Sequence, residues 1–178
     1  MQRILVMGSS GSGKSTFSKR LSSITGIPMV SVDALFWKAG WIESGKEEFH
    51  ARLGAAARQP RWIMDGNFTS HLVELRRDAC DTLIWFDLPR ATCMKGILTR
   101  VAKSYGRVRP EMTEGCPERI DLKFFHYVWT FRERVRPKLL AYFEGLRPDQ
   151  TFMAFTDRAQ ADRYLNELAA APALASAH

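Results

Sequence analysis

The sequence predicts an α/β fold in which one parallel β-sheet of about five strands lies between two layers of helices. Two regularities of the 178-residue chain support this prediction. Short apolar runs recur along the chain and each ends at a glycine or a polar residue, while helical patterns separate one run from the next. Strands that alternate with helices are typical of parallel sheets, because parallel neighbours need a long crossover connection. Ligands of such sheets bind beyond the carboxyl ends of the strands.

The apolar runs are the expected strands. A short uninterrupted apolar run is typical of a strand that is buried on both faces of a parallel sheet. The runs cover residues 4–7, 28–32, 62–64, 83–86 and 152–155. The residues that close them, and that we therefore place at the ligand-binding edge, are Gly8, Asp33, Asp65, Asp87 and Thr156–Asp157.

Helical periodicity between the runs predicts the crossover helices. Apolar residues recur at helical spacing over residues 14–25, 47–58, 72–79, 91–104 and 159–170. A short helix over residues 34–38 is also compatible with the sequence. Strand and helix therefore alternate through most of the chain.

The segment 105–145 interrupts this alternation. It opens with turn-forming residues, namely Gly106, Pro110, Gly115 and Pro117. It continues as a helical stretch in which near-helical spacing predicts a separate core for the insertion, made by Leu122, Phe125, Val128 or Trp129, and Phe131. We expect a single domain over residues 1–170, with insertions at about 34–60 and about 105–136, and a disordered alanine-rich tail over 171–178.

The composition is that of a basic globular protein. Apolar residues make up 46% of the chain and charged residues 25%, which excludes the disordered and fibrous classes. The net charge of +7 suits an anionic ligand such as a nucleotide, and it equally suits a nucleic acid. Residues 100–138 contain ten Lys or Arg and five Asp or Glu, so this stretch supplies five of the seven net charges.

The cysteines and the N-terminus indicate a cytoplasmic protein. Cys80, Cys93 and Cys116 form neither a CxxC pair nor a zinc-binding spacing, so we expect free thiols in a reducing compartment. The apolar run 4–7 is too short for a signal-peptide core or a membrane span.

Residues 8–15 read GSSGSGKS and match the phosphate-binding consensus G-x-x-x-x-G-K-[ST]. The motif follows an expected strand and precedes an expected helix, as its mechanism requires. Its glycines let successive backbone N–H groups point at phosphate oxygens, and the helix adds its positive end. We expect ATP to bind Gly8, Ser9, Ser10, Gly11, Ser12, Gly13, Lys14, Ser15 and Thr16.

Three residues of this P-loop have individual roles by position. Lys14 would reach the β- and γ-phosphates, Ser15 would ligate Mg²⁺ and Thr16 would support the loop or the α-phosphate. A GTPase would need a base-reading Asn-Lys-x-Asp element, which this sequence lacks, and helicases and transport ATPases normally have longer chains. The sequence therefore favours a small-molecule kinase, in which a basic lid closes over the phosphates.

Several longer motifs are more distinctive than the P-loop itself. They are GSSGSGKST at 8–16, VDALFWKAGW at 32–41, WIMDGNF at 62–68, IWFDLPR at 84–90 and GCPERIDLKFFHYVWTFRERVRP at 115–137. With these motifs the chain resembles the adenylate-kinase-like family of P-loop kinases over nearly its whole length, and most closely a bacterial group known as topology modulation proteins. That label describes a cellular effect and implies no chemistry of its own.

The resemblance implies a P-loop NTPase three-layer sandwich with a helical lid. It also implies ATP as the donor, acceptor-site residues after the second and third strands, at Asp33 and at Asp65-Gly66-Asn67, and catalytic arginines in the lid. True adenylate kinases continue this Asp-Gly with Phe-Pro-Arg, whereas this chain continues it with Asn67-Phe68-Thr69. This departure argues against AMP as the acceptor.

Asp33, Trp37 and Trp41 are the candidate acceptor-binding residues of the first insertion. Asp33 ends the second run, where it would orient or deprotonate an acceptor hydroxyl; the alternative is a helix N-cap. Trp37 and Trp41 would sandwich a planar acceptor, or else pack the insertion against the sheet.

Asp65 resembles the acidic residue that ends a P-loop strand and holds Mg²⁺, usually through water. We therefore assign Ser15 and Asp65 to the metal and Asp65 and Asn67 to the substrate. Asp87 precedes Leu88-Pro89, and we interpret it as structural, in the manner of a helix cap.

Arginines of residues 100–136 are the candidates for clamping the transferred phosphate, because a guanidinium binds two phosphate oxygens at once. They are Arg100, Arg107, Arg109, Arg132, Arg134 and Arg136. Arg132 and Arg136 share a helical face, so we predict that this pair is the catalytic clamp, and we assign Arg100 to ATP binding. His126 has no visible partner in the sequence and receives no catalytic role.

These assignments give two candidate functions. The first is transfer of the ATP γ-phosphoryl group to a small acceptor, carried by Lys14, Asp33 and the arginine pair. The second is a nucleic-acid-associated ATPase, or DNA topology-modulating protein, motivated by the basic stretch 100–138 and its aromatic residues. A nucleotide switch without efficient chemistry is a third reading.

Overall fold

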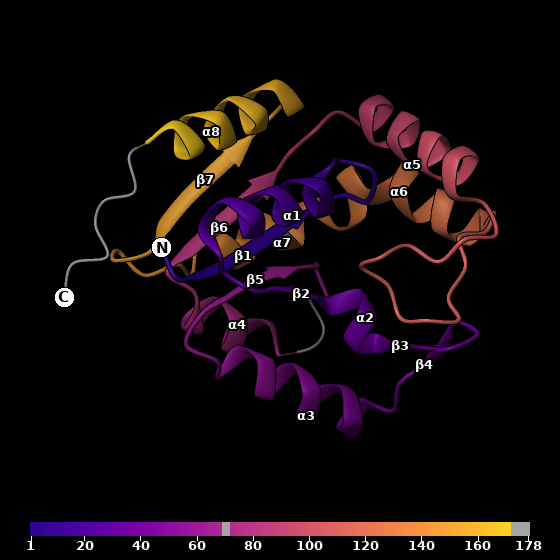
Figure 1. Cartoon of the computed structure of the whole chain (residues 1–178), viewed down its shortest axis with the longest axis horizontal. Coiled ribbons are helices and arrows are strands. Elements are labelled where there is room, and N and C mark those ends of the chain that lie inside the picture. The colour runs from indigo at the N-terminus through magenta and orange to yellow at the C-terminus, as the bar shows by residue number, and fades with distance from the viewer. Residues whose placement is uncertain (69–71, 172–178) are drawn as a thin grey trace.

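The computed structural model describes residues 1–68 and 72–171, and its centre is a five-stranded parallel sheet. The strand order is β2-β5-β1-β6-β7. The strands are β1 (Arg3–Gly8), β2 (Met29–Ser31), β5 (Trp62–Asp65), β6 (Thr82–Phe86) and β7 (Thr151–Phe155). The predicted fold class and all five predicted strands are therefore confirmed (Figure 1).

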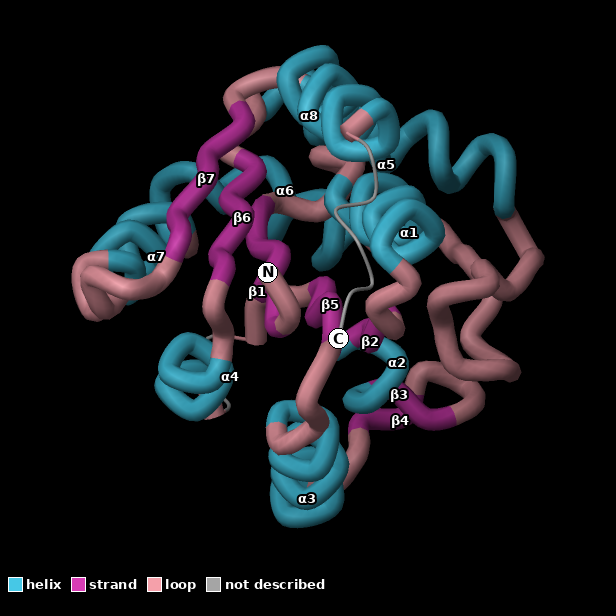
Figure 2. The backbone as a smooth tube through the Cα atoms, turned by 60° about the vertical axis from the view of Figure 1, so that its left-hand side comes forward, coloured by secondary structure: helices cyan, strands magenta, loops and turns pink. Residues whose placement is uncertain are grey.

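Helices cover both faces of the sheet (Figure 2). The helices that were predicted are α1 (Lys14–Thr25), α3 (Lys46–Ala57), α4 (Val73–Ala79), α5 (Arg90–Ser104) and α8 (Arg158–Ala170). Helices α2 (Val32–Phe36) and α6 (Leu122–Arg134) fall where the sequence indicated a short helix near 34–38 and a helical stretch within 105–145, and α7 (Arg136–Phe143) follows α6. Among the described residues, no helix is both long enough and apolar enough to cross a membrane.

The alternation of side chains along the strands divides the core into two clusters. Ile4 and Val6 of β1 point into one cluster, where residues of α1, α5 and α8 cover them. Leu5 and Met7 point into the other, where residues of α3 and α7 cover them. Successive residues of a strand face opposite sides of a sheet, so the apolar run builds both clusters at once.

The first insertion differs in detail from the expected short helix over 34–38. The helix begins at Val32, because Ser31 caps it by accepting a hydrogen bond from the Ala34 backbone at 3.2 Å. It ends at Phe36, and a two-stranded hairpin follows, made by β3 (Trp37–Lys38) and β4 (Ile42–Glu43).

The separate core predicted for the second insertion is wrong. Val128 and Phe131 of α6 are buried, but each joins one of the two main clusters. Leu122 and Trp129 are 79% and 53% exposed. Helix α6 therefore belongs to the body of the domain, and the segment that overhangs the sheet edge is the loop 105–121, which we call the lid loop (Figure 1). Of the predicted tail 171–178, residues 172–178 lie outside the described residues.

Candidate functional site

The P-loop joins β1 to α1 and has the backbone that its glycines allow. Gly11 and Gly13 have φ angles of 77° and 107°, in the left-handed region. A Cβ at Gly11 would lie 2.2 Å from the carbonyl oxygen of Cys93 in α5, so only glycine fits there. Gly96 lies one turn further along α5, and a Cβ at this position would lie 2.1 Å from the Gly11 carbonyl oxygen. Helix α5 therefore packs directly against the loop and fixes its shape.

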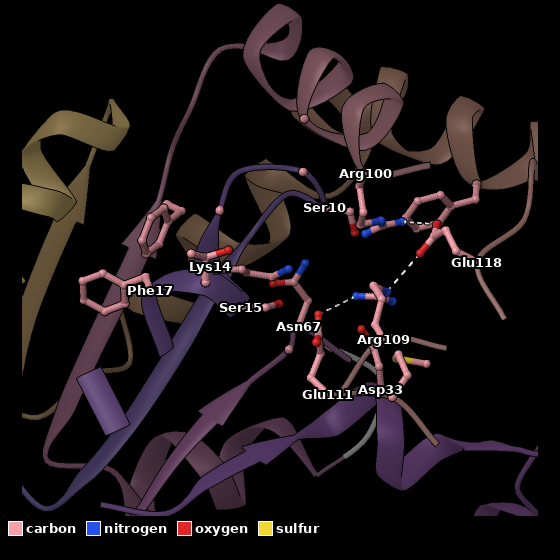
Figure 3. Close-up of a pocket in the computed structure, with 18 of the residues that line it drawn as sticks. Ser10, Lys14, Ser15, Phe17, Asp33, Asn67, Arg100, Arg109, Glu111 and Glu118 are labelled. Carbon is pink, nitrogen blue, oxygen red and sulfur yellow. Dashed lines mark hydrogen bonds and ion pairs between the residues drawn. The ribbon is translucent and has the colours of Figure 1, made fainter. Parts of the chain in front are cut away.

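A cavity of about 1280 Å³ opens over this loop at the carboxyl edge of the sheet. The P-loop forms its floor, α1, α5 and the start of α8 line one side, and α2, β3 and the residues after β5 line the other. Arg109, Glu111 and Glu118 of the lid loop also line the cavity and lie across it from Lys14 (Figure 3). The cavity lies where ligands of open parallel sheets bind.

Lys14 and Ser15 line the cavity, and both meet Asp65, which lies just beneath them. The Ser15 hydroxyl donates a hydrogen bond to Asp65, and Lys14 Nζ lies 4.0 Å from Asp65 Oδ1. Asp65 is only 5% exposed, and Oδ1 has no hydrogen-bond partner among the described residues. A buried carboxylate oxygen without a donor beside a hydroxyl fits a hard cation such as Mg²⁺.

The same floor offers only part of a metal coordination sphere. Among residues 1–68 and 72–171 there is no group of three acidic, histidine or cysteine side chains that would hold a metal ion. A magnesium ion held by Ser15 and Asp65 would therefore depend on phosphate oxygens and water for its other ligands. This arrangement is typical of sites in which Mg²⁺ binds together with a nucleotide.

Asp33 lies on the acceptor side of the cavity, in the first turn of α2 (Figure 3). Because Ser31 caps that helix, the interpretation of Asp33 as the N-cap is wrong. Burial raises the pKa of the Asp33 carboxyl; the positive charge of Lys14 opposes this shift, and the negative charge of Asp65 adds to it. A carboxyl with a raised pKa is suited to accept a proton near neutral pH.

Trp37 and Trp41 both line the cavity, but they do not form the predicted sandwich. Their ring centroids are 5.6 Å apart at an interplanar angle of 71°, so the two rings touch edge to face. Trp41 also donates a hydrogen bond from Nε1 to the Pro117 carbonyl, at 2.9 Å. A flat ligand would therefore rest against these rings and would not enter between them.

Asn67, predicted as a substrate contact, lines the cavity and also holds the P-loop. Its side-chain oxygen accepts a hydrogen bond from the Gly8 backbone N–H, and its Nδ2 donates to the Gly8 carbonyl, both at 2.9 Å. The amide therefore ties the end of β5 to the start of the P-loop. Asn67 borders the cavity, and in this structure its amide positions the loop.

The predicted arginine clamp is not at the cavity. Arg136 donates two hydrogen bonds to the Asp87 carboxylate, at 2.8 and 2.6 Å, and Arg132 Nη1 lies 3.8 Å from the same carboxylate. Neither arginine lines the cavity. The prediction assumed one continuous helix, but α6 ends at Arg134 and α7 begins at Arg136. Asp87 is structural as predicted, through these arginines; the N-cap of α5 is Pro89.

The lid-side arginines that line the cavity are Arg100, Arg109 and Arg119, and the first two share one carboxylate. Arg100 Nη2 and Arg109 Nε lie 3.0 and 2.9 Å from the two carboxylate oxygens of Glu118. Arg109 also pairs with Glu111 at 3.0 Å, and Glu111 pairs with Lys19 of α1 at 2.5 Å. This chain of ion pairs holds the lid loop over the P-loop. It contains three cations and two carboxylates, which leaves a positive charge beside the phosphate site.

Two further arginines were missed by the sequence analysis. Arg158, at the start of α8, donates to the carbonyls of Gly11 and Ser12, at 2.7 and 3.2 Å, and so braces the P-loop. Arg76 of α4 is fully buried and donates to the carbonyls of Gly66, Asn67 and Phe68. Burial lowers the pKa of Arg76 to about 10. The helical pattern over residues 72–79 gave no indication that Arg76 would be buried and would bind these three carbonyls.

Among the comparisons with known proteins, only the comparison with solved structures gives matches. No family model matches the sequence, and no curated protein matches it. Solved structures do match. The chain is similar to a shikimate kinase from Bacteroides thetaiotaomicron, with a TM-score of 0.55 and 17% identity over 94% of this chain and 96% of that one. It is also similar to a shikimate kinase from Acinetobacter baumannii in complex with shikimate, with a TM-score of 0.56 and 13% identity over 94% of this chain and 90% of that one.

A third similar structure is a gluconokinase from Sinorhizobium meliloti 1021, with a TM-score of 0.53 and 16% identity over 95% of this chain and 90% of that one. At such low identity the similarity establishes the fold alone. The chain has the fold of the P-loop kinases.

Proposed function

We propose that this chain is a magnesium-dependent phosphotransferase that moves the γ-phosphoryl group of ATP to a hydroxyl group of a small acceptor. The observation that carries the proposal is the shared cavity. Lys14 and Ser15 line this cavity, Asp65 lies beside them and accepts a hydrogen bond from Ser15, and Asp33 lines the side opposite the helices that would hold the nucleotide. The kinase fold of the similar structures supports it.

The P-loop would hold the donor. Its backbone N–H groups and the start of α1 would bind the phosphates, and Lys14 would contact the β- and γ-phosphates. Magnesium, when bound, neutralises phosphate charge at the position that Ser15 and Asp65 define. Arg158 keeps the loop in shape by holding two of its carbonyls.

Asp33 would act on the acceptor. The acceptor oxygen attacks the γ-phosphorus as the bond between that phosphorus and the bridging oxygen of ADP breaks, and Asp33 receives the hydroxyl proton. Arg100 and Arg109 are the cations best placed to neutralise charge on the transferred group, in place of Arg132 and Arg136. Phosphoryl transfer needs chiefly such positioning and charge neutralisation, which this cavity supplies.

The finer assignments of the resemblance remain part of the proposal. They comprise membership of the adenylate-kinase-like group, ATP as the preferred nucleotide, a cytoplasmic location and one kinase domain over residues 1–170. Their support is the set of sequence motifs together with the P-loop kinase fold.

The nucleic-acid alternative has less support. Of the ten basic residues in 100–138, Arg100, Arg109, Arg119, Arg132 and Arg136 pair with carboxylates. These pairs reduce the positive surface on which that reading depends. Oligonucleotide binding that weakens steeply with salt and responds to ATP would favour it.

The experiment that tests the proposal is ADP release from ATP across a panel of hydroxyl acceptors, with and without Mg²⁺. We expect acceptor-stimulated ADP release in the wild type and none in Lys14→Met, whose circular dichroism should stay native because Lys14 is at the ligand site. Failure to bind Mg²⁺-ATP, or unchanged turnover in Lys14→Met, would contradict the proposal.

A further inference from the structure

The acceptor side of the cavity has a distinctive composition. The wall formed by α2, β3 and the residues after β5 consists of Asp33, Phe36, Trp37, Gly66, Asn67 and Phe68. Within the described part of the chain, this wall contains three aromatic rings and one carboxyl group, and it has no lysine or arginine. Residues 69–71 lie outside the description.

The two arginines of the facing lid loop that line the cavity are already paired. Arg109 lies between Glu111 and Glu118, at 3.0 and 2.9 Å. Arg119 lies 3.8 Å from Asp121, and its guanidinium stacks over the Trp41 ring at 5.4 Å. An anionic group entering here would have to compete with carboxylates that these arginines already hold.

Other basic residues of the cavity belong to the nucleotide side. Arg20, Lys95 and Arg158 come from α1, α5 and α8, which cover the opposite face of the sheet from α2. Near the acceptor side, Lys38 and Arg52 both pair with Glu48 and do not line the cavity. Among the described residues, each arginine that the lid side brings to the cavity, namely Arg100, Arg109 and Arg119, therefore already pairs with a carboxylate.

We infer that the acceptor is an uncharged hydroxyl compound with a flat or apolar ring, of which a nucleoside is the model, and that phosphorylated or carboxylated acceptors are excluded. This inference rests on the proposed function. A second anion would lie beside the Asp33 carboxyl and would have to displace the carboxylates that already pair with Arg100, Arg109 and Arg119, which is unfavourable. A neutral ring would instead rest on the aromatic wall, and its hydroxyl would donate to Asp33.

Trp37 is the wall residue best suited to a test. It lines the cavity from the β3 hairpin and is partly exposed, so its replacement by leucine removes ring surface without touching the P-loop. Trp129 is the matched control, because it lies on α6 outside the cavity and is 53% exposed.

The experiment compares neutral acceptors with anionic ones. ADP release is measured with purine and pyrimidine nucleosides against their 5′-monophosphates, and with neutral ring alcohols against shikimate and gluconate, which are carboxylates. The mass of the product identifies phosphoryl transfer. We expect a neutral acceptor to raise ADP release at least tenfold over the acceptor-free rate, with no stimulation by its anionic counterpart.

The tryptophan variants test the wall itself. Loss of one ring contact should raise the acceptor KM of Trp37→Leu about threefold to tenfold, because such contacts contribute about 0.5 to 1.5 kcal/mol. The ATP KM should not change, and Trp129→Leu should leave both constants unchanged.

Two results overturn the inference and leave the proposed function standing. One is stimulation by the anionic member of a pair, and the other is silence of every neutral acceptor in a protein that binds Mg²⁺-ATP. If the acceptor KM is the same in Trp37→Leu and in the wild type, the aromatic wall does not contact the acceptor. Absence of nucleotide binding would instead contradict the proposed function itself.

Discussion

The Ser15 hydroxyl donates a hydrogen bond to the Asp65 carboxylate, so the first turn of α1 meets the end of β5. The strands β1 and β5 are parallel neighbours, with Val6 opposite Asp65. The P-loop that follows β1 and the acidic residue that ends β5 therefore leave the sheet side by side. This relationship, joined by Lys14 at 4.0 Å, defines where a nucleotide-bound metal would lie.

Replacement of Asp65 by asparagine should weaken the use of Mg²⁺. An aspartate that holds the metal through water acts from its outer shell, and loss of such a group reduces metal affinity on the order of tenfold to a hundredfold. The measurement is a Mg²⁺ titration of turnover at fixed ATP. Asp87→Asn is the control, because Asp87 follows strand β6 on the other side of β1 and pairs with Arg136, and it should keep the wild-type Mg²⁺ requirement. Identical titrations for the two variants would remove Asp65 from the metal site.

Asp33→Asn should abolish the acidic limb of the pH–rate profile. Burial raises the pKa of Asp33 above its ordinary value of 3.8, so the active, deprotonated form appears as the pH rises through this raised pKa. In the wild type, kcat/KM should therefore rise with pH over that range, with a midpoint above 3.8. The variant should lose about 10² to 10⁴ in rate, which is the usual contribution of a general base. If the acidic limb persists in Asp33→Asn, the limb reports the titration of another group.

Much of the fold followed from the sequence because its signals are local. The apolar runs and the P-loop are contiguous stretches, so the strands, most helices and the positions of Lys14, Ser15 and Asp65 were predictable. The arginines were not, because their partners are distant in sequence. Arg158 contacts Gly11, 147 residues away, and the break between α6 and α7 redirected Arg132 and Arg136. Only the packed structure shows which arginine meets which oxygen.

Arg136→Ala should reduce stability and leave phosphoryl transfer unchanged. The two hydrogen bonds from Arg136 hold the pKa of Asp87 below its ordinary value of 3.8, so the pair stabilises the fold above that pH. This stabilisation is lost as the pH falls through the lowered pKa. Urea unfolding should show a loss on the order of 1 kcal/mol at neutral pH, allowing for solvent screening. The difference between variant and wild type should shrink below the ordinary pKa. A large fall in kcat in Arg136→Ala would contradict this assignment and would indicate that Arg136 binds the transferred phosphate.

Arg76→Ala should disturb both stability and the acceptor site. The side chain satisfies three carbonyls of the segment 66–68, and buried carbonyls without donors cost about 1 to 3 kcal/mol each. We expect the free energy of unfolding to fall by at least about 2 kcal/mol. The acceptor KM should rise while the ATP KM changes little, and added guanidinium ion should restore part of the activity.

Arg77→Ala is the matched control for Arg76. Arg77 is the next residue of α4, but it pairs with Asp78, stacks over the Tyr142 ring and does not line the cavity, so its removal should not change the acceptor KM. If both KM values of Arg76→Ala equal those of the wild type, Arg76 contributes to stability but does not position the acceptor site.

The central claim is tested most directly by following the γ-phosphate of ATP in the presence of Mg²⁺ and an acceptor. The account predicts that wild-type protein places the phosphate on the acceptor, as shown by product mass, and that folded Lys14→Met forms no such product. Release of the γ-phosphate only as inorganic phosphate, at a rate that no acceptor changes, would contradict the assignment of this protein as a phosphotransferase.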